Sequence, residues 1–489
     1  MHIQENILKK TSILINEKKF EKAKLVLLNF LKDGKNIKIS QRIYYQLYLV
    51  FNGLREFKNA KNYLEKCLKI NENNHIVLNN LANIFLKEKN LIKAEKFYLK
   101  SIDKKKDYSI AIINLAILYE QVGRLEESKK CYLKAISLEP KKISIYYNLS
   151  RIDKNFINKK KIDFLKDLLN NEKLELIDKA YSFFLIAQYE RKNNFFKKEI
   201  FYLKKAHQNL FNSQLNLNNE LLNYWLNIIS KKYNTFKFIN RSKDNELTSF
   251  DPVFIIGLPR SGSTIVETIL SSGDTNVRNF GETNMFNGAL LSTHNLLREK
   301  DDNKINLNLI NKTIKDFIEY ENIQKTENKI FTDKSLENFF YIEIILKIFP
   351  KAKFINTFRN LEDNVFAIFQ QAFLKMSWTN SIEHILEYID NYLKVISFFK
   401  NQYPDKILSL NLEDLTMNPK EVSKKLFKFC GLKWNEKVLK FYKREDLIVT
   451  TASNIQIREN INKYDFEKYE PYKEFLKIFS GKYDWLSQK

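Results

Sequence analysis

Small and apolar residues recur with a fixed period of 34 residues in the first part of the chain. Three consecutive copies share one frame, in which Ala60, Ala94 and Ser128 occupy the same position. The aligned sets are Tyr44, Leu47, Phe51, Ala60, Leu64 and Cys67; Leu78, Leu81, Phe85, Ala94, Tyr98 and Ser101; Ile112, Leu115, Tyr119, Ser128, Tyr132 and Ala135. A period of this length indicates stacked pairs of helices, and the small residues would let the paired helices approach closely.

This pattern resembles the tetratricopeptide repeat. Looser copies flank the three clear ones, around residues 20–30 and 183–206. The resemblance implies an α-solenoid with a concave face for an extended partner. We expect the solenoid to span residues 1–212 and a helical linker to span residues 213–250, where the period is lost and the sequence becomes polar.

Charge divides the chain in the same way. Residues 1–250 contain 48 Lys and Arg against 26 Asp and Glu, whereas residues 251–489 contain 34 against 32. A basic solenoid can attract acidic ligands. Its lysines can equally be solvated faces of a structural clamp, and both interpretations stay open. No motif of a nucleic-acid reader is present, so we expect no nucleic-acid partner.

Composition excludes several classes of protein. Hydrophobic residues make up 44% of the chain, which excludes intrinsic disorder. No apolar stretch approaches the ~18 residues of a membrane-spanning helix, and the charged N-terminus does not resemble a signal peptide, so we expect a cytoplasmic protein. The three cysteines are far apart and the five histidines are scattered, so we expect neither disulfides nor a metal site.

Glycine and proline are scarce, with 10 and 7 in 489 residues, which predicts a mostly helical chain. Five of the glycines nevertheless lie close together, and this clustering indicates a backbone that side chains would obstruct. They are Gly257, Gly262, Gly273, Gly281 and Gly288.

A short apolar run at residues 253–256 predicts a strand that leads into GLPRSGST, residues 257–264, and then into a helix. Strand, glycine loop and helix aim backbone N–H groups at an anion. The spacing is close to the nucleoside-triphosphate loop GxxxxGK[ST], but Ser263 stands in place of its lysine, and Arg260 lies inside the loop.

The segment VFIIGLPRSGSTIVETIL resembles the 5′-phosphosulfate loop of sulfotransferases. It is most similar to the bacterial branch that carries tetratricopeptide repeats ahead of the catalytic domain and is related to protein-tyrosine sulfotransferases. The resemblance implies an α/β P-loop-type domain with a mostly parallel sheet over residues 251–489. It also implies that 3′-phosphoadenosine 5′-phosphosulfate (PAPS) is the donor and that a hydroxyl or amine accepts the sulfuryl group.

The resemblance assigns roles to particular residues. The loop residues would hold the 5′-phosphosulfate, with the guanidinium of Arg260 on its oxygens and no requirement for magnesium. These loop residues are Ser261, Gly262, Ser263 and Thr264. Glu282, in NFGETN, would be the catalytic base, and Lys334, in FTDKS, would reach the bridging oxygen. Arg359, after the strand expected at 354–358, would hold the 3′-phosphate.

The C-terminal part both matches and departs from the family. Ser453 aligns with a serine near the leaving phosphate, and Arg458 with the arginine of a Gln-x-Arg motif. The serine expected eight residues after Arg359 is Ala367, and the turn that covers the 3′-phosphate is shortened to YDFEK, residues 464–468. Arg458 or Lys463 could replace the lost contact.

Three functions therefore remain in view. The first is a PAPS-dependent sulfotransferase whose repeats position the acceptor or a partner. The second is a repeat adaptor on a weakened sulfotransferase fold, favoured by Ala367 and the shortened turn. The third is an ATP-dependent kinase or hydrolase, disfavoured by the missing loop lysine. The acceptor stays open among an acidic peptide, a glycan and a small hydroxyl compound.

Overall fold

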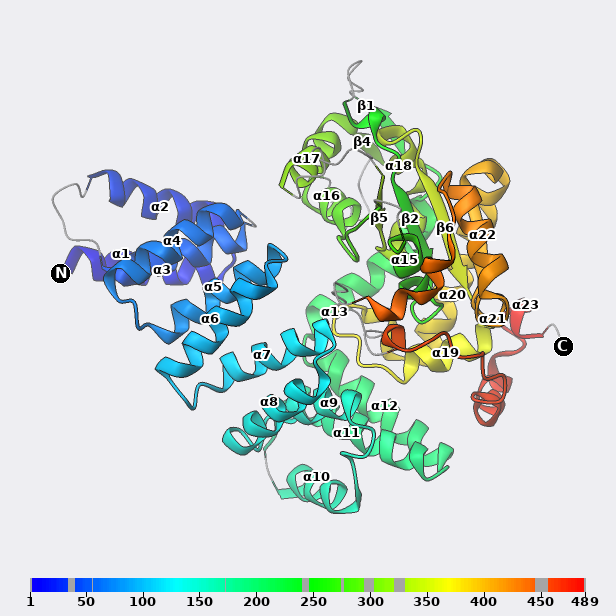
Figure 1. The fold of residues 1–489 in the computed structure, drawn as a ribbon, viewed down its shortest axis with the longest axis horizontal. Coiled ribbons are helices and arrows are strands. Elements are labelled where there is room, and N and C mark those ends of the chain that lie inside the picture. Colours follow the sequence, from blue (N-terminus) through cyan, green and yellow to red (C-terminus); the bar gives the residue numbers. More distant parts are fainter. Residues whose placement is uncertain are drawn as a thin grey trace. The chain divides into compact units, whose positions relative to one another are not determined.

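The structure is a computed structural model in which the chain folds into two compact units, Met1–Asp153 and Lys154–Lys489 (Figure 1). The residues that it describes are 2–33, 40–54, 56–171, 173–239, 246–273, 277–293, 303–320, 330–444 and 456–487. Among these residues, no helix combines the length and the apolar character that crossing a membrane requires.

The first unit consists of the predicted helix pairs. Its helices are α1 (His2–Asn16), α2 (Phe20–Asp33), α3 (Gln41–Gly53), α4 (Phe57–Ile70), α5 (His75–Lys87), α6 (Leu91–Lys104), α7 (Ser109–Val122), α8 (Leu125–Leu138) and α9 (Ile143–Ile152). Helices α3, α5 and α7 begin 34 residues apart, and so do α4, α6 and α8. Ala60, Ala94 and Ser128 are fully buried, as expected for the small positions between packed helices. The predicted helical repeat is confirmed.

Local sequence sets the ends of these helices. The side chain of Asn74 accepts hydrogen bonds from the N–H groups of Ile76 and Val77 and so caps the start of α5. Gly123 ends α7 in the left-handed conformation, with φ of 83°, which glycine adopts without strain. Each repeat thus carries its own start and stop signals.

Helices precede the sheet in the second unit. They are α10 (Lys159–Asn171), α11 (Leu176–Lys192), α12 (Phe196–Asn212), α13 (Leu215–Asn223), a π-helical turn (Tyr224–Ile228) and α14 (Ile229–Lys232). Buried groups tie α12 to later parts of this unit. His207 donates a hydrogen bond to the carbonyl oxygen of Phe369 (2.7 Å), and Glu199 accepts from Gln370 (3.0 Å) and Tyr472 (2.6 Å).

Because of these contacts, α12 belongs to the second compact unit, and the boundary between the units lies after residue 153. The sequence instead places the end of the solenoid at 212. Helices α11 and α12 contain the looser repeat copy expected at residues 183–206, and its small residues Ala187 and Ala206 are buried, as in the clear repeats. The domain boundaries at 212 and 250 stay a prediction.

Among the described residues, five parallel strands form the sheet of the second unit, in the order β3-β5-β2-β6-β7. Their bounds are β2 (Val253–Gly257), β3 (Arg278–Asn279), β5 (Phe331–Asp333), β6 (Lys353–Phe358) and β7 (Ile407–Asn411). A second sheet pairs β1 (Lys237–Ile239) with β4 (Lys304–Asn306), also in parallel. The expected parallel α/β architecture is confirmed.

Helices cover both faces of the large sheet. The helices that follow the first strand are α15 (Ser263–Leu270), α16 (Met285–Thr293), α17 (Leu307–Tyr320), α18 (Ile342–Ile348), α19 (Leu361–Phe369), α20 (Ile382–Gln402), α21 (Leu412–Met417), α22 (Pro419–Cys430) and α23 (Asp484–Ser487). Ile255 of β2 packs with Val266 of α15 and Phe427 of α22, whereas its neighbour Phe254 contacts Phe286 of α16. Successive residues of the central strand therefore point to two different helical layers.

Candidate active site

The glycine loop connects the central strand to α15 at the carboxyl edge of the sheet. Gly257 has a φ of +134°, and a Cβ there would lie 2.2 Å from the carbonyl oxygen of Thr357 on β6. Gly262 caps α15 with a φ of +89°. Both glycines are therefore required by the backbone, and the loop places the N-terminus of α15 where parallel α/β sheets bind ligands.

The loop side chains have different surroundings. The hydroxyl of Ser261 donates to the carbonyl oxygen of Leu258 (2.6 Å) and lies 2.8 Å from the hydroxyl of Thr357, so it fixes the loop to β6. Ser263 and Thr264 occupy the first turn of α15, and Arg260 adopts a left-handed conformation with φ of 67°. This strained arginine conformation is the kind found at ligand-binding loops.

A cavity of about 260 Å³ opens beside the loop. Its lining comes from the loop, from α21 and from the C-terminal segment 459–469. The basic residues of the lining are Arg260, Arg359, Lys463 and Lys468. The lining also contains Glu459 and Asp465, so basic side chains outnumber acidic ones by four to two. Together with the helix N-terminus, this excess makes the cavity suited to an anionic ligand.

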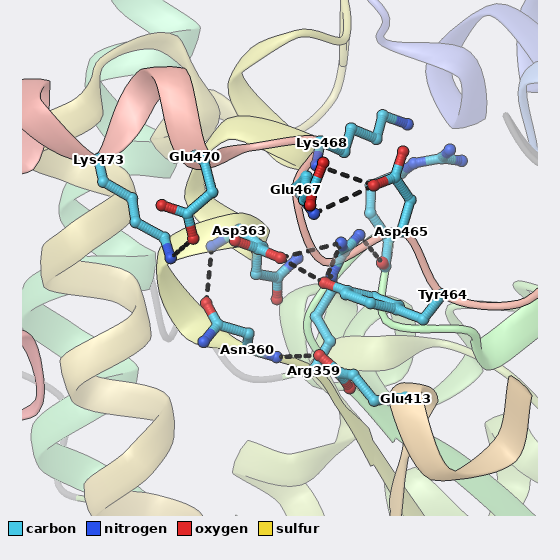
Figure 2. Close-up of polar contacts among 12 residues, drawn as sticks. Arg359, Asn360, Asp363, Glu413, Tyr464, Asp465, Glu467, Lys468, Glu470 and Lys473 are labelled. Carbon is cyan, nitrogen blue, oxygen red and sulfur yellow. Dashed lines mark hydrogen bonds and ion pairs between the residues drawn. The ribbon is translucent and has the colours of Figure 1, made fainter. Parts of the chain in front are cut away.

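Arg359 lies directly after β6 and is 9% exposed, and its guanidinium lies beside the hydroxyl of Tyr464 (Figure 2). Its Nε and Nη2 atoms both donate to the hydroxyl of Tyr464, with an Nε distance of 3.2 Å, and Nη1 donates to the carbonyl oxygen of Arg260 at 3.4 Å. The Tyr464 hydroxyl donates in turn to Asp363 (2.5 Å), whose carboxylate lies 3.8 Å from Arg359. Ala367 is buried on α19, so that helix supplies no hydroxyl at this position.

A second charged cluster lies around Lys334, which follows β5 and is 1% exposed. Its Nζ atom donates to Glu282 at 2.9 Å and lies 4.0 Å from Glu267 of α15. Glu267 also accepts hydrogen bonds from the N–H of Gly281 (3.0 Å) and the hydroxyl of Thr332 (3.2 Å). Glu267 therefore joins α15, the Gly281–Glu282 turn and β5 into one cluster.

Burial and charge oppose each other in this cluster. Burial alone would lower the pKa of Lys334, but Glu282 and Glu267 outweigh it and raise that pKa above its usual value. Burial raises the pKa of the Glu267 carboxyl, against the opposing effect of Lys334. Burial also raises the pKa of Glu337 to about 7, with the carboxylates of Glu282 and Asp333 adding to the shift. Lys334 thus remains protonated at neutral pH.

The Glu282 turn is also held from its other side. Asp333 is fully buried and accepts hydrogen bonds from Thr283, from the N–H of Ser335 and from Asn338 (3.1 Å). Glu282 itself is exposed, with 42% of its side chain accessible. An exposed carboxylate on a fixed turn can receive a proton from a molecule that approaches from solvent.

The structure groups the predicted residues into these two clusters. Five of them line the cavity, namely Arg260, Gly262, Ser263, Thr264 and Arg359. Glu282 pairs with Lys334. Arg458 is half-buried. Ser453 lies outside the described residues.

Sequence reasoning missed Glu267, Asp363 and Tyr464. Glu267 lies in the apolar stretch STIVETIL, where a lone acidic residue suggests only an exposed helix position. The signal in the sequence is the acidic residue within an apolar stretch, because a carboxylate on a buried helix face needs a cationic partner. Tyr464 belongs to the shortened turn, for which the family pattern offers no equivalent.

Comparison with known proteins finds separate matches in the two units of the chain. The sequence profile described as "Sulfotransferase family" matches residues 252–436, and that of the tetratricopeptide repeat matches residues 41–74 and 111–142. An uncharacterized protein of Aquifex aeolicus (strain VF5) is 29% identical over 336 residues, which are 64% of this chain and 43% of that protein. The protein ycf37 of Porphyra purpurea is 32% identical over 75 residues, 15% of this chain and 43% of its own. The chain thus covers less than half the length of either relative.

Solved structures with similar parts include the sulfotransferase domain from the Synechococcus PCC 7002 olefin synthase, with 18% identity, a TM-score of 0.33, and coverage of 46% of this chain and 88% of that one. Pseudomonas aeruginosa PilF has 16% identity and a TM-score of 0.32 over 41% of this chain and 88% of its own. These TM-scores are low, so the assignment depends on the family profiles. The chain thus joins a region of tetratricopeptide repeats to a domain that matches the profile of the sulfotransferase family.

Proposed function

We propose that the second unit transfers a sulfuryl group from PAPS to a hydroxyl or amine. The observation that carries this proposal is the cavity that brings the glycine loop and Arg359 together at the carboxyl ends of β2 and β6. PAPS has phosphate or phosphosulfate groups at both ends of its ribose, and the two guanidinium groups of the cavity suit such a ligand.

In this proposal the residues of the chain divide the work. Arg260 and the N–H groups at the start of α15 hold the 5′-phosphosulfate, and Arg359 holds the 3′-phosphate. Glu282 accepts the proton of the acceptor group while the acceptor oxygen or nitrogen forms its bond to sulfur. Lys334 stabilises the negative charge that develops on the phosphate oxygen as its bond to sulfur breaks.

Glu267 has a supporting part in the same proposal. When Glu282 takes up a proton, Lys334 loses one negative neighbour but keeps the carboxylate of Glu267 at 4.0 Å. Because opposite charge favours the protonated amine, Glu267 would keep Lys334 charged throughout the transfer. The acceptor is not assigned by these residues, and the repeats would present it or a partner protein.

One observation favours a second candidate, an adaptor with a weakened transferase domain. Arg359 already contacts Tyr464 and Asp363, and Ala367 stands where the sequence comparison expects a serine eight residues after Arg359. An adaptor would bind the nucleotide weakly or without turnover. A kinase or hydrolase that uses ATP would depend on magnesium.

Product formation from PAPS separates these candidates. We would measure release of adenosine 3′,5′-bisphosphate in the presence of 4-nitrophenol, a tyrosine-containing acidic peptide and glucosamine, without magnesium. A transferase produces nucleotide in proportion to sulfated acceptor, and the variant Glu282→Gln loses this activity. Equal nucleotide release by both proteins, without sulfated product, would contradict the proposal.

A further inference from the structure

Three of the five N–H groups of the Arg359 guanidinium already donate hydrogen bonds within the protein. The hydroxyl of Tyr464 accepts hydrogen bonds from Nε and Nη2, and the carbonyl oxygen of Arg260 accepts one from Nη1. The rings of Tyr464 and Tyr469 also lie 4.9 and 5.2 Å from the guanidinium. Tyr464 therefore contacts the Nε–Nη2 edge of the guanidinium, one of the edges that a phosphate group can use for a bidentate interaction.

Tyr464 has no remaining capacity to bind a phosphate from this position. A phenol hydroxyl donates one hydrogen bond and accepts two. Its one donated bond goes to Asp363 at 2.5 Å, and both accepted bonds come from Arg359 (Figure 2). A phosphate that binds the Nε–Nη2 edge of Arg359 must therefore displace the hydroxyl and cannot simply add to it.

The exchange is physically feasible for an anion. A phosphate carries full charge and forms stronger hydrogen bonds with a guanidinium than a neutral phenol does. Tyr464 lies in the segment 459–469, which holds no helix or strand, so its side chain can move without breaking regular structure. Asp363 opposes the exchange, because its carboxylate lies 3.8 Å from Arg359 and would then face a second negative group.

We propose that Tyr464 limits donor specificity: its hydroxyl is an internal ligand on the Nε–Nη2 edge of Arg359, and a 3′-phosphate that binds this edge displaces it. The inference rests on the proposed function, because it takes Arg359 as the 3′-phosphate residue. A nucleotide with a 5′-phosphate alone binds the glycine loop and leaves the Tyr464–Arg359 contact in place. When a 3′-phosphate binds the Nε–Nη2 edge of Arg359, the protein loses the Tyr464–Arg359 contact, so Tyr464 reduces the gain in affinity that the 3′-phosphate gives.

The test is magnesium-free calorimetry of the full chain with adenosine 3′,5′-bisphosphate and adenosine 5′-phosphate. The variant Tyr464→Phe keeps the ring and removes the hydroxyl. We expect it to bind the bisphosphate about tenfold more tightly, while adenosine 5′-phosphate binding changes by less than about twofold. The matched control Tyr403→Phe removes a phenol hydroxyl from the same unit, outside the cavity lining, and should leave both affinities unchanged.

The ratio of the two dissociation constants decides the question, because a general structural effect would move both. An unchanged or smaller preference for the bisphosphate in Tyr464→Phe would overturn the inference and leave the proposed function intact. A smaller preference would mean that the hydroxyl helps to bind the phosphate. If neither protein bound the bisphosphate while circular dichroism showed both to be folded, the inference and the proposed function would fail together.

Discussion

Lys334 and Arg359 are both buried cations at the carboxyl edge of the same sheet, but their partners differ in kind. Lys334 is held by two carboxylates, Glu282 and Glu267, on a fixed turn and a helix. Arg359 donates hydrogen bonds to a neutral phenol, Tyr464, from a segment without regular structure, and its carboxylate neighbour Asp363 lies 3.8 Å away and accepts from that phenol. One cation is neutralised by fixed opposite charge, and the other keeps a partner that an anion can replace.

This difference indicates two separate tasks. A lysine surrounded by carboxylates keeps its proton and offers positive charge without reorganisation when negative charge develops beside it. An arginine whose ligand is a phenol can exchange that ligand for a phosphate group. In the proposed function, the Lys334 cluster would therefore carry the chemistry and the Arg359 cluster would bind the nucleotide.

The largest effect should follow from Glu282→Gln, which removes the proposed base and keeps the shape of the side chain. We expect turnover to fall by about 10²- to 10⁴-fold, with bisphosphate affinity nearly unchanged, because the amide cannot take up the acceptor's proton. The control Glu343→Gln removes a carboxylate on α18 whose charged neighbour is Lys347, and it should behave like the parent protein. Equal losses of turnover and affinity would count against a base at this position.

Replacing the buried lysine tests the other side of that cluster. Lys334→Met leaves Glu267 buried without its cation, and we expect the free energy of unfolding to fall by about 3 kcal/mol in urea titrations at pH 7. The folded-state pKa of Glu267 is already raised and would rise further. Its effect on stability is therefore favourable at low pH and is lost as the pH rises through the folded pKa.

The variant should accordingly recover stability relative to the parent protein between pH 7 and pH 5. The control is Lys353→Met, because the Nζ atom of Lys353 donates to a carbonyl oxygen of Phe429. It should lose about 1 kcal/mol without that pH dependence. The same loss at every pH in Lys334→Met would mean that Glu267 is not the group left uncompensated.

Arg359→Gln should affect binding more than chemistry. We expect affinity for adenosine 3′,5′-bisphosphate to fall by about 30- to 100-fold and affinity for adenosine 5′-phosphate to change little, since only the first uses this guanidinium. Calorimetry of Arg444→Gln serves as the control, because Arg444 donates to Ser271 at the end of α15. Parallel losses for both nucleotides would show that Arg359 does not distinguish them.

The smallest effect should come from restoring the family's hydroxyl. Ala367→Ser should tighten bisphosphate binding by about threefold, because the added hydroxyl can donate a hydrogen bond to the phosphate but Arg359 still has to release Tyr464. Combined with Tyr464→Phe, it should add to that variant's gain. No change in either background would mean that the 3′-phosphate lies elsewhere in the cavity.

The sequence predicts the elements that carry this site closely. The strands expected at 253–256 and 354–358 are β2 and β6, the helix after the glycine loop is α15, and the 34-residue period gives the starts of the repeat helices. These predictions hold because each depends on local signals, namely apolar runs, glycines with positive φ and small residues at a fixed spacing.

The partners of the two cations could not be predicted from local signals. Tyr464 and Arg359 are about a hundred positions apart, and nothing in YDFEK indicates that its tyrosine meets a guanidinium. Glu267 reaches Gly281 and Lys334 only through the order of the strands. Such contacts depend on how distant segments pack, and a single sequence does not contain that information.

The measurement that tests the central claim most directly is magnesium-free calorimetry of the parent protein with adenosine 3′,5′-bisphosphate, adenosine 5′-phosphate and ATP. The account predicts micromolar binding of the bisphosphate and a preference for it over the other two, because the bisphosphate alone presents anions to both the glycine loop and Arg359. A folded protein that binds ATP more tightly, or does not bind the bisphosphate, would contradict it.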